Sequence, residues 1–521
     1  MNTRYFHWSL LFLALATLLG SCSDWLDVKP ETEDREKDLF TSYQGFKDAL
    51  AGCYSTMAGT DLYGERLTMT DVECLACLWD APNQTQMPEA YAFHSHFYTS
   101  PDAESAIKAI YGGLFNVTAQ ANKILQHIDN GAITDPDARN VMEGEALALR
   151  AYCQFDVLRL FGQMPQQQGT AVKLPYATKS DIHELAAWYD FNSYVKMLYR
   201  DLDKADSLLK LSDPITKYSI DGLNQQGTDA AKLDDDFMTY RQFRLNYYAV
   251  KGVLARLDLY VGNRQQAYND AMAVINAQVN GQPFMTLAGN KDLGITVDGS
   301  LTSYATLPDE CVFALSNRKL SNYAFSLLGN GGLAVDEGSS LHITTNMLDK
   351  QLYNGRNTTS DNRYLYVWNH DAHNASGKKV PTLTKYFYNT AYYNTSARYN
   401  TLLTKVQLMP MLRLSELYLI AIESTDDLAQ ANSLYKTYMQ SHNVNITDDF
   451  KSLNAVKEEL EYEYTREFYG EGQTFYAYKR WGVTWMLFGT APMKEAQYVL
   501  PLPNTEFDPN AASNGTSSTT K

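Results

Sequence analysis

Helical periodicity dominates two long parts of this chain. Apolar residues recur at spacings of three and four from Ile107 to Ile128 and again from Tyr247 to Val261, a pattern that predicts amphipathic helices. The second helix is followed by Gly262-Asn263 and then by small residues at Ala267 and Ala271. Because alanines let paired helices approach closely, this stretch predicts a helical hairpin of the tetratricopeptide type.

A similar pair is expected nearer the C-terminus. Residues 413–423 place apolar side chains on one stripe, and a partner helix is predicted from about Leu428 to Ser441. The period of about 34 residues that marks a regular tetratricopeptide array does not run through the chain. The helix pairs are therefore expected to be interrupted by other material rather than stacked into a regular solenoid.

The interruption is expected over residues 286–407, which are rich in Asn, Gly, Ser, Thr and Tyr. Short runs at 311–315 and 364–368 read as strands, so the segment predicts long loops with small hairpins. Ordered loops on a rigid frame are where binding residues usually lie. The predicted fold is mostly α-helical: one domain over residues 42–508, with a helical frame at 42–285 and 408–490.

The amino-terminal end has the pattern of a secretion leader. Arg4 precedes an apolar run from Trp8 to Leu19 that is too short to span a bilayer. The run ends in Leu19-Gly20-Ser21-Cys22, which resembles the bacterial lipobox, whose cysteine is acylated and becomes the first mature residue. We therefore expect a signal peptide at residues 1–21, lipid on Cys22 and a charged flexible tether at 22–41.

Two acidic residues sharpen the expected location. Asp24 and Asp27 follow the cysteine closely and resemble the surface-export signal of outer-membrane lipoproteins in some Gram-negative bacteria. This pattern predicts a body that faces the cell exterior. Residues 509–521 are polar and small, and we expect them to form a disordered tail.

Composition narrows the possible partners. The chain has 44 Lys and Arg against 60 Asp and Glu, a formal net charge of −16, which argues against nucleic acid. After the leader, no segment approaches 18 consecutive apolar residues, so the lipid is the expected anchor. The 37 tyrosines are unusual, because tyrosine suits partly wet binding surfaces as well as cores.

The chemistry-bearing residues favour a protein that is not an enzyme and has no cofactor. The chain has no Gly-x-Ser-x-Gly elbow, no phosphate-binding glycine loop and no His-Glu-x-x-His helix. Glutamates from Glu461 to Glu471 are expected to face solvent or to pair with neighbours on a helix. No metal site is predicted. His94-Ser95-His96 and the pair His370 and His373 have spacings that would suit transition-metal ligands, but they are equally typical of solvated loop histidines. Binding of calcium by loop carboxylates is neither predicted nor excluded.

The remaining cysteines are expected to be buried free thiols. Five stay after Cys22 is set aside, an odd number spread too widely for a disulfide scaffold. Cys74 and Cys77 have the spacing of a redox or zinc pair, but no second pair or histidine cluster accompanies them.

Several motifs, taken in order along the chain, resemble the SusD/RagB family of outer-membrane nutrient-binding lipoproteins. Gly144 to Tyr152, continuing to the Arg159 to Pro165 stretch, resembles the "GEA-x-x-LRA … R-x-FG-x-x-P" signature. Ser360 to Arg363 is similar to the "D-x-R" turn, and Leu412 to Leu419 to "R-x-x-E-x-YL". Departures cluster near the C-terminus, where Tyr464 to Glu467 replaces the usual "ER-x-x-E".

The resemblance implies a role as well as a fold. Members of the family capture a glycan, or in some cases a peptide, at the cell surface. Their usual partner is a SusC-like TonB-dependent transporter, over whose barrel the lipoprotein acts as a lid. Glycan capture is the main expectation for this chain; a peptide-binding member and a helical scaffold without a nutrient ligand are the alternatives.

The candidate ligand residues combine aromatic rings with polar partners. Sugar rings stack their C–H faces on Trp and Tyr, while their hydroxyls need acidic, amide or basic side chains. The loop after the first helices fits this description, and Trp79 and Asp80 are its strongest candidates. The full set of candidates is Asp71, Trp79, Asp80, Asn83, Tyr91, Tyr304, Tyr323 and Trp368.

Overall fold

The structure is a computed structural model that describes residues 38–167, 172–180, 185–224, 232–295, 301–303, 305–329, 334–386 and 408–503. The expected signal peptide, Cys22, nearly all of the tether, Tyr304 and the tail at 509–521 lie outside the described residues.

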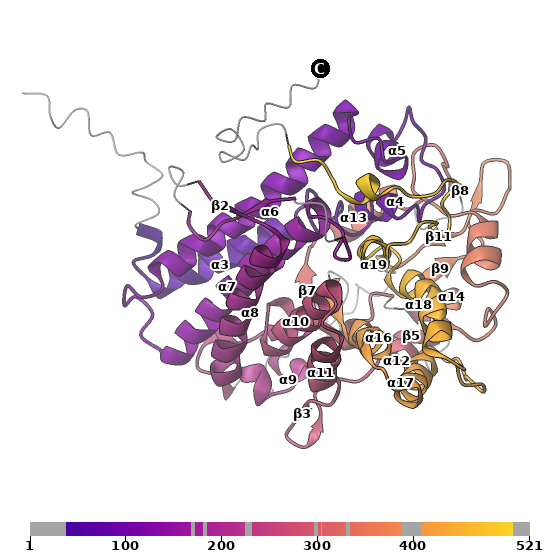
Figure 1. Ribbon diagram of the computed structural model, residues 1–521. Helices are drawn as coiled ribbons and strands as arrows, with labels where there is room; N and C mark the ends of the chain where they lie inside the picture. The colour runs from indigo at the N-terminus through magenta and orange to yellow at the C-terminus, as the bar shows by residue number, and fades with distance from the viewer. Residues whose placement is uncertain are drawn as a thin grey trace, which may run out of the picture.

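Four long helices pack side by side in chain order on one side of the molecule (Figure 1). They are α3 (Tyr43–Met57), α6 (Pro101–His127), α7 (Pro136–Phe161) and α8 (Phe191–Ser212). Each begins after a serine or aspartate whose side chain accepts a backbone N–H of the first turn: Ser42, Ser100, Asp135 and Asp190. The predicted helix around residues 107–128 is confirmed as α6.

Helix pairs continue the frame toward the C-terminus. Helix α10 (Tyr247–Val261) packs on α8 and ends at Gly262, whose φ of 89° is the left-handed conformation that favours glycine. Helix α11 (Arg264–Ile275) returns along α10 and then packs on α16 (Leu414–Ser424), which pairs with α17 (Leu428–Ser441). Both predicted hairpins are confirmed. We call these eight helices the helical frame.

One longer strand pair crosses the molecule. Strand β7 (Cys311–Ser316) pairs antiparallel with β12 (Leu408–Arg413), with Met409 opposite Leu315. The prediction of a strand at 311–315 is confirmed. The prediction at 364–368 is wrong, because α14 (Asn362–Val367) occupies nearly all of it, and the Asp361 side chain caps this helix by accepting the N–H of Arg363.

The remaining elements are short except for the last two helices. The helices are α4 (Asp71–Leu75), α5 (Pro88–His94), α9 (Ile220–Asn224), α12 (Gly289–Asp292), α13 (Leu320–Leu327), α18 (Leu453–Phe468), α19 (Thr474–Trp481), the 3-10 turns η1 (Pro214–Thr216), η3 (Asp236–Met238), η4 (Arg241–Phe243), η5 (Pro308–Glu310) and η8 (Glu495–Tyr498), and the π-helical turn η6 (Asn346–Leu352). The strand pairs are β1 (Leu174–Tyr176) with β2 (Ala187–Tyr189), β3 (Gln278–Val279) with β4 (Gln282–Pro283), β5 (Leu293–Ile295) with β6 (Leu301–Ser303), β8 (Ala334–Val335) with β10 (His373–Asn374), and β9 (Trp368–Asn369) with β11 (Thr382–Leu383).

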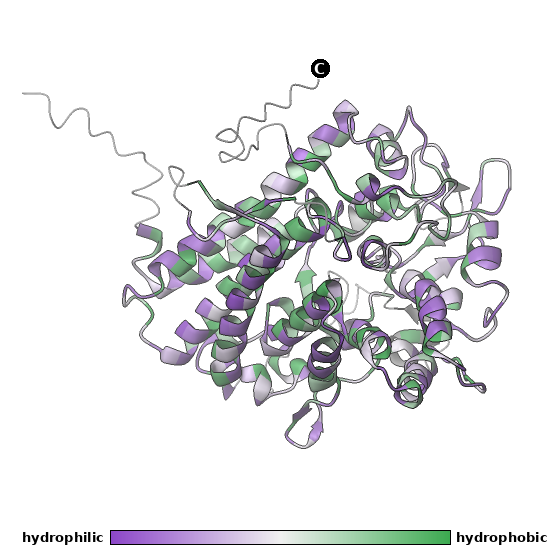
Figure 2. Ribbon diagram, in the orientation of Figure 1, coloured by the Kyte–Doolittle hydropathy of each residue, from purple (hydrophilic) through white to green (hydrophobic). Residues whose placement is uncertain are grey.

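A single large apolar cluster runs from Phe40 to Leu500, and a smaller one lies beneath α17 and α18. Apolar residues gather where neighbouring helices face one another (Figure 2). The five cysteines from Cys53 to Cys311 are buried free thiols, as predicted. Within the part of the chain that the structure describes, no helix is long and apolar enough to cross a membrane.

Tyrosine–carboxylate hydrogen bonds explain part of the tyrosine excess. Tyr63 donates to Asp156 at 2.7 Å, and Tyr176 donates to Asp201 at the same distance. Tyr54 and Tyr199 make the same kind of bond, to Glu145 and Asp258. Tyr63 and Tyr176 are buried, so they satisfy an acid and stabilise the fold rather than present a surface, whereas Tyr54 and Tyr199 are half-buried.

Candidate ligand-binding site

The loop between α4 and α5, residues 76–87, carries three of the eight predicted ligand residues: Trp79, Asp80 and Asn83. It is held in place by backbone contacts: the Asp80 N–H donates to the His342 carbonyl at 2.9 Å. The Asn83 side chain accepts the N–H groups of Thr85 and Gln86 at 2.9 and 3.0 Å. These bonds fix one loop conformation and present the side chain of Asp80 at the surface.

Trp79 lies beneath this loop and is fully buried. Its indole N–H donates to the Met69 carbonyl at 2.9 Å, and its ring meets Tyr469 edge-to-face at 5.1 Å. Trp368 is also buried and meets the same Tyr469 ring at 4.8 Å. The structure thus brings two predicted ligand aromatics together, but it corrects their role: neither has an exposed face on which a sugar could stack.

Asp71 is a second correction. Its side chain is 1% exposed and lies 3.5 Å from the Arg66 guanidinium. Burial raises the pKa of Asp71 well above its usual range, with the Glu89 carboxylate acting in the same direction and Arg66 opposing both. Arg66 also binds both oxygens of Glu89 at 3.0 Å. Asp71 therefore belongs to a packed charge cluster at the start of α4 and offers no oxygen to a ligand.

Asp80 lies at the centre of a polar surface patch. Its carboxylate is 43% exposed and lies 3.7 Å from His342 Nε2, which is 3.9 Å from Glu337. Asn374 donates to Glu337 at 2.7 Å, and this bond lowers the pKa of Glu337. We call Asp80, Asn83, Glu337, His342 and Asn374 the Asp80 surface.

The Asp80 surface combines segments that are distant in the sequence. Strand β8 pairs in parallel with β10, which brings Glu337 and Asn374 from the 286–407 segment to the α4–α5 loop. The carboxylates and amides provide both acceptors and donors for hydroxyl groups, whereas the His342 ring is buried. Sequence analysis missed Glu337, His342 and Asn374, because no local spacing signals a contact that depends on a two-residue strand pair.

The other predicted aromatics lie in different places. Tyr91 is half-buried on α5, one turn before His94, whose pKa is lowered by burial while the nearby Asp80 carboxylate opposes this shift. Tyr91 therefore shares a helix face with a residue that adjoins the Asp80 surface. Tyr323 is half-buried on α13, where its hydroxyl accepts a hydrogen bond from Asn317 at 3.1 Å.

Two cavities of ligand size lie outside the Asp80 surface. One, of about 610 Å³, lies on the frame beside Trp481, whose indole N–H donates to Glu423 at 2.8 Å. The other, of about 650 Å³, is lined by α3, the Phe237–Arg244 segment and residues 315–319, and we call it the α3 cavity. Asn317, the partner of Tyr323, is one of its lining residues.

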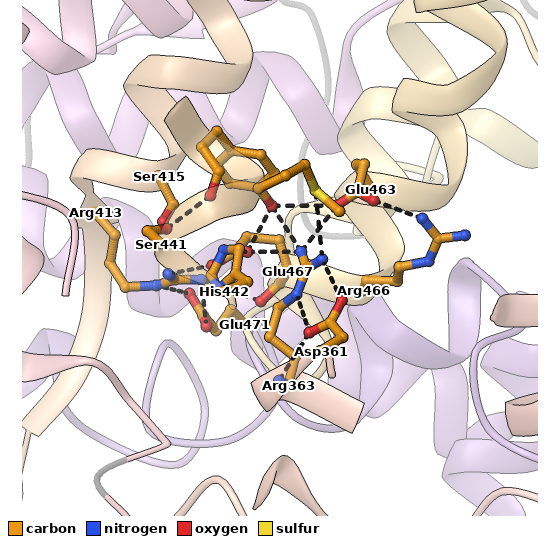
Figure 3. A network of polar contacts seen from close by, with 12 residues as sticks. Asp361, Arg363, Arg413, Ser415, Ser441, His442, Glu463, Arg466, Glu467 and Glu471 are labelled. Carbon is orange, nitrogen blue, oxygen red and sulfur yellow. Dashed lines mark hydrogen bonds and ion pairs between the residues drawn. The ribbon is translucent and has the colours of Figure 1, made fainter. Parts of the chain in front are cut away.

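The glutamates of α18 and the following loop form a buried network (Figure 3). Arg363 donates to Glu463 at 2.8 Å and to Glu467 at 3.1 Å, and Arg413 donates to both oxygens of Glu471 at 3.0 and 2.9 Å. Of the two predicted alternatives, facing solvent or pairing with neighbours, these three acids pair, mainly with arginines from other elements rather than from their own helix. Their oxygens are bound by cations, so the network joins α14, β12 and α18 and leaves no carboxylate free for acid–base chemistry.

The charged groups of this network lower the pKa of Glu467. Burial alone would raise the pKa of Glu467, but Arg413, His442 and Arg363 together hold it well below its usual range. His442 Nε2 lies 3.0 Å from this carboxylate. In the described residues, no group of three or more His, Cys, Asp or Glu side chains has the geometry to hold a metal ion.

Comparison with known proteins agrees with this fold. Residues 24–214 match a family model described as "Starch-binding associating with outer membrane". A SusD superfamily protein of Bacteroides thetaiotaomicron superposes with a TM-score of 0.62 at 19% identity, over 89% of this chain and 96% of that one. The chain resembles the SusD/RagB family in fold, and residues 24–214 match a model of that family.

Two further relatives extend the comparison. A laminarin-binding SusD-like protein has a TM-score of 0.59 at 16% identity, over 89% of this chain and 96% of that one. SusD-like protein P2 of Formosa agariphila is 23% identical over 240 residues, which are 46% of this chain. The match spans 44% of that relative's length. The mostly helical fold with tetratricopeptide-like pairs, predicted from the sequence, is confirmed.

Proposed function

We propose that this protein is a surface-exposed outer-membrane lipoprotein that captures a glycan and delivers it to a SusC-like TonB-dependent transporter, over which it acts as a lid. The observation that carries the proposal is the SusD fold. A laminarin-binding SusD-like protein shares this fold over 89% of the present chain. The outer-membrane description of the matching family model and the lipobox ending in Cys22 support the location.

The Asp80 surface is the proposed glycan contact. Asp80 and Glu337 are partly exposed and lie on either side of His342. A charged acceptor that bonds a sugar hydroxyl contributes about 1.5–3 kcal/mol when it is shielded from water by the ligand. Half-buried Tyr91 is the aromatic residue nearest in the chain that can contribute a ring face.

The proposed capture is non-catalytic. The buried glutamates from Glu463 to Glu471 are saturated by arginine and lysine partners, so they cannot exchange protons with a glycan. We expect a bound oligosaccharide to be recovered with its length unchanged. Cleavage of the ligand that a single carboxylate substitution abolishes would contradict this part of the proposal.

The first test is a binding panel. Purified protein lacking the leader is run in native gels that contain starch, laminarin, xylan or polygalacturonate, and we expect one of these polysaccharides to retard it. The double variant Asp80→Ala/Asn83→Ala should then bind the same polysaccharide roughly tenfold more weakly or worse. Asp129→Ala, which removes a carboxylate that is 78% exposed elsewhere, is the matched control and should bind normally.

Two outcomes separate this proposal from its alternatives. Retardation by none of the polysaccharides, together with capture of an oligopeptide mixture, would replace the glycan by a peptide ligand. Binding of neither, with retained co-purification of a transporter, would indicate a scaffold. Because a lid contacts its transporter through another surface, Asp80→Ala/Asn83→Ala should still co-purify with the SusC-like barrel.

A further inference from the structure

The α3 cavity is separate from the Asp80 surface and differs from it in charge. Residues from three distant segments line it: helix α3 with its C-terminal turn, the Phe237–Arg244 segment, and residues 315–319 after β7. Its volume of about 650 Å³ is within the range of cavities that hold small organic ligands.

The charged residues that line the α3 cavity all have the same sign. They are Lys47, Arg244, Arg318 and Lys319, and no aspartate or glutamate belongs to the lining. This is unexpected in a chain whose formal net charge is −16. A concave site with one sign of charge attracts ligands of the opposite sign.

Two of the four cations are already paired. Lys47 lies 3.1 Å from Asp236 and 3.8 Å from Asp235, and Arg244 donates to the buried Glu145 at 2.9 Å. Asp235, Asp236 and Glu145 do not belong to the lining; Asp236 is 89% exposed, whereas Glu145 is buried. Arg244 also stacks on the Phe237 ring at 3.9 Å.

The other two cations are exposed and unpaired. Arg318 and Lys319 follow the end of β7, and neither side chain forms an ion pair with any residue in the described ranges. Arg244 adds a further unmet donor, since its buried Nη2 has no hydrogen-bond partner among those same residues. The lining therefore has positive charge that the described residues do not neutralise.

Long-range hydrogen bonds hold the walls of the α3 cavity. The Asn317 side chain donates to the Ala58 carbonyl at 2.9 Å, which joins the turn after β7 to the end of α3. Within α3, Tyr54 donates to Glu145 at 2.7 Å and accepts the Leu245 N–H at 2.9 Å, which joins this helix to the segment after η4. Walls fixed in this way reduce the ordering cost of binding.

We propose that the α3 cavity binds an acidic sugar residue, one that carries a carboxylate or sulfate, with the anion held by Arg318 and Lys319 at its mouth. The rings of Tyr54, Phe237 and Phe243 line the interior and suit the apolar face of a sugar. The inference rests on the proposed glycan-binding function and adds to it a second site and a ligand class.

The test compares acidic and neutral polysaccharides of matched backbone. The probes are polygalacturonate with its fully methyl-esterified form, and dextran sulfate with dextran. We expect wild-type protein to bind at least one of the acidic members roughly tenfold more tightly than its neutral counterpart, and added salt to weaken this preference. Which acidic probe binds identifies carboxylate or sulfate as the anion.

The variant Arg318→Ala/Lys319→Ala should abolish the preference and leave the melting temperature unchanged, because both side chains are exposed. The control Arg356→Ala/Lys436→Ala makes the same change in charge at side chains that are 63% and 43% exposed and lie outside the cavity lining, in the turn after η6 and on α17. The control variant should keep the preference.

The outcomes separate the two proposals. Equal binding of acidic and neutral members, or a preference that survives in Arg318→Ala/Lys319→Ala, overturns the acidic-sugar site and leaves glycan capture standing. An equal loss in the control variant also overturns it, since net charge alone would then explain the effect. Failure to bind any polysaccharide overturns the proposed function and with it this inference.

Discussion

Trp79 shows how one residue type can serve two roles. Its position in an early loop beside Asp80 fits a stacking platform, yet the side chain is fully buried against Tyr469 and bonded to Met69. We predict that Trp79→Ala destabilises the protein by about 3–5 kcal/mol through the cavity it leaves. The free energy of unfolding in urea measures this.

The matched control for that prediction is Trp485→Ala. Trp485 is 59% exposed, so its removal should change stability by no more than about 0.5 kcal/mol. If Trp79→Ala kept normal stability and lost only glycan binding, the packing role would be contradicted and the ring would have to reach the ligand in another conformation.

At the scale of single residues, the sequence shows which side chains could bind a ligand, but it does not show which of them reach solvent. Asp80 and Trp79 are adjacent, and only the structure shows that one reaches solvent and the other fills the core. Arg318 and Lys319 were missed for a related reason. Two adjacent cations in a loop are ordinary in sequence, and they become informative only when α3 is folded against them.

At the scale of elements, helix pairs joined by a short turn could be predicted from contiguous residues, whereas pairs formed by distant segments could not. The turn at Gly262 predicts the α10–α11 pair because the left-handed residue and the following helix are contiguous. The run at 364–368 is rich in aromatic and β-branched residues, which favour strands, but the Asp361 cap and its ion pair with Arg363 at 2.8 Å start a helix there. Strand β12 was missed because its partner, β7, lies about a hundred residues earlier in the chain.

Glu467 couples three of these elements, and its ionisation should set the acid stability of the fold. Its pKa is held below the ordinary value of 4.5, so its ionised form stabilises the folded state above that pH. As the pH falls below about 4.5 the unfolded chain takes up the proton first, and this stability is lost. We predict a urea midpoint that is steady near neutrality and falls in acid.

The variant Glu467→Gln tests this assignment. Removing one partner leaves buried arginine charge uncompensated, which costs about 3–5 kcal/mol near neutrality, and the remaining dependence on acid should be shallower than in wild type. Glu458→Gln changes an exposed acid of the same helix and serves as the control. An unaltered acid dependence in Glu467→Gln would show that other carboxylates determine it.

At the scale of the whole molecule, the features divide between a frame and two surfaces. The core buries Trp79, Trp368 and Asp71, three of the residues that first suggested binding. What stays available is the Asp80 surface, with acidic and amide groups, and the α3 cavity, with unpaired cations. A protein tethered by Cys22 with Asp24 and Asp27 after it would expose both surfaces to nutrients outside the cell.

The most direct test of the account is retention of a fluorescent glycan, chosen from the binding panel, on intact cells that express the full chain. We predict that wild-type cells hold the label at their surface, that external protease releases it, and that cells with Cys22→Ala lose it because the unanchored protein leaves the outer membrane. Equal retention by wild-type and Cys22→Ala cells would contradict capture by a lipid-anchored surface protein.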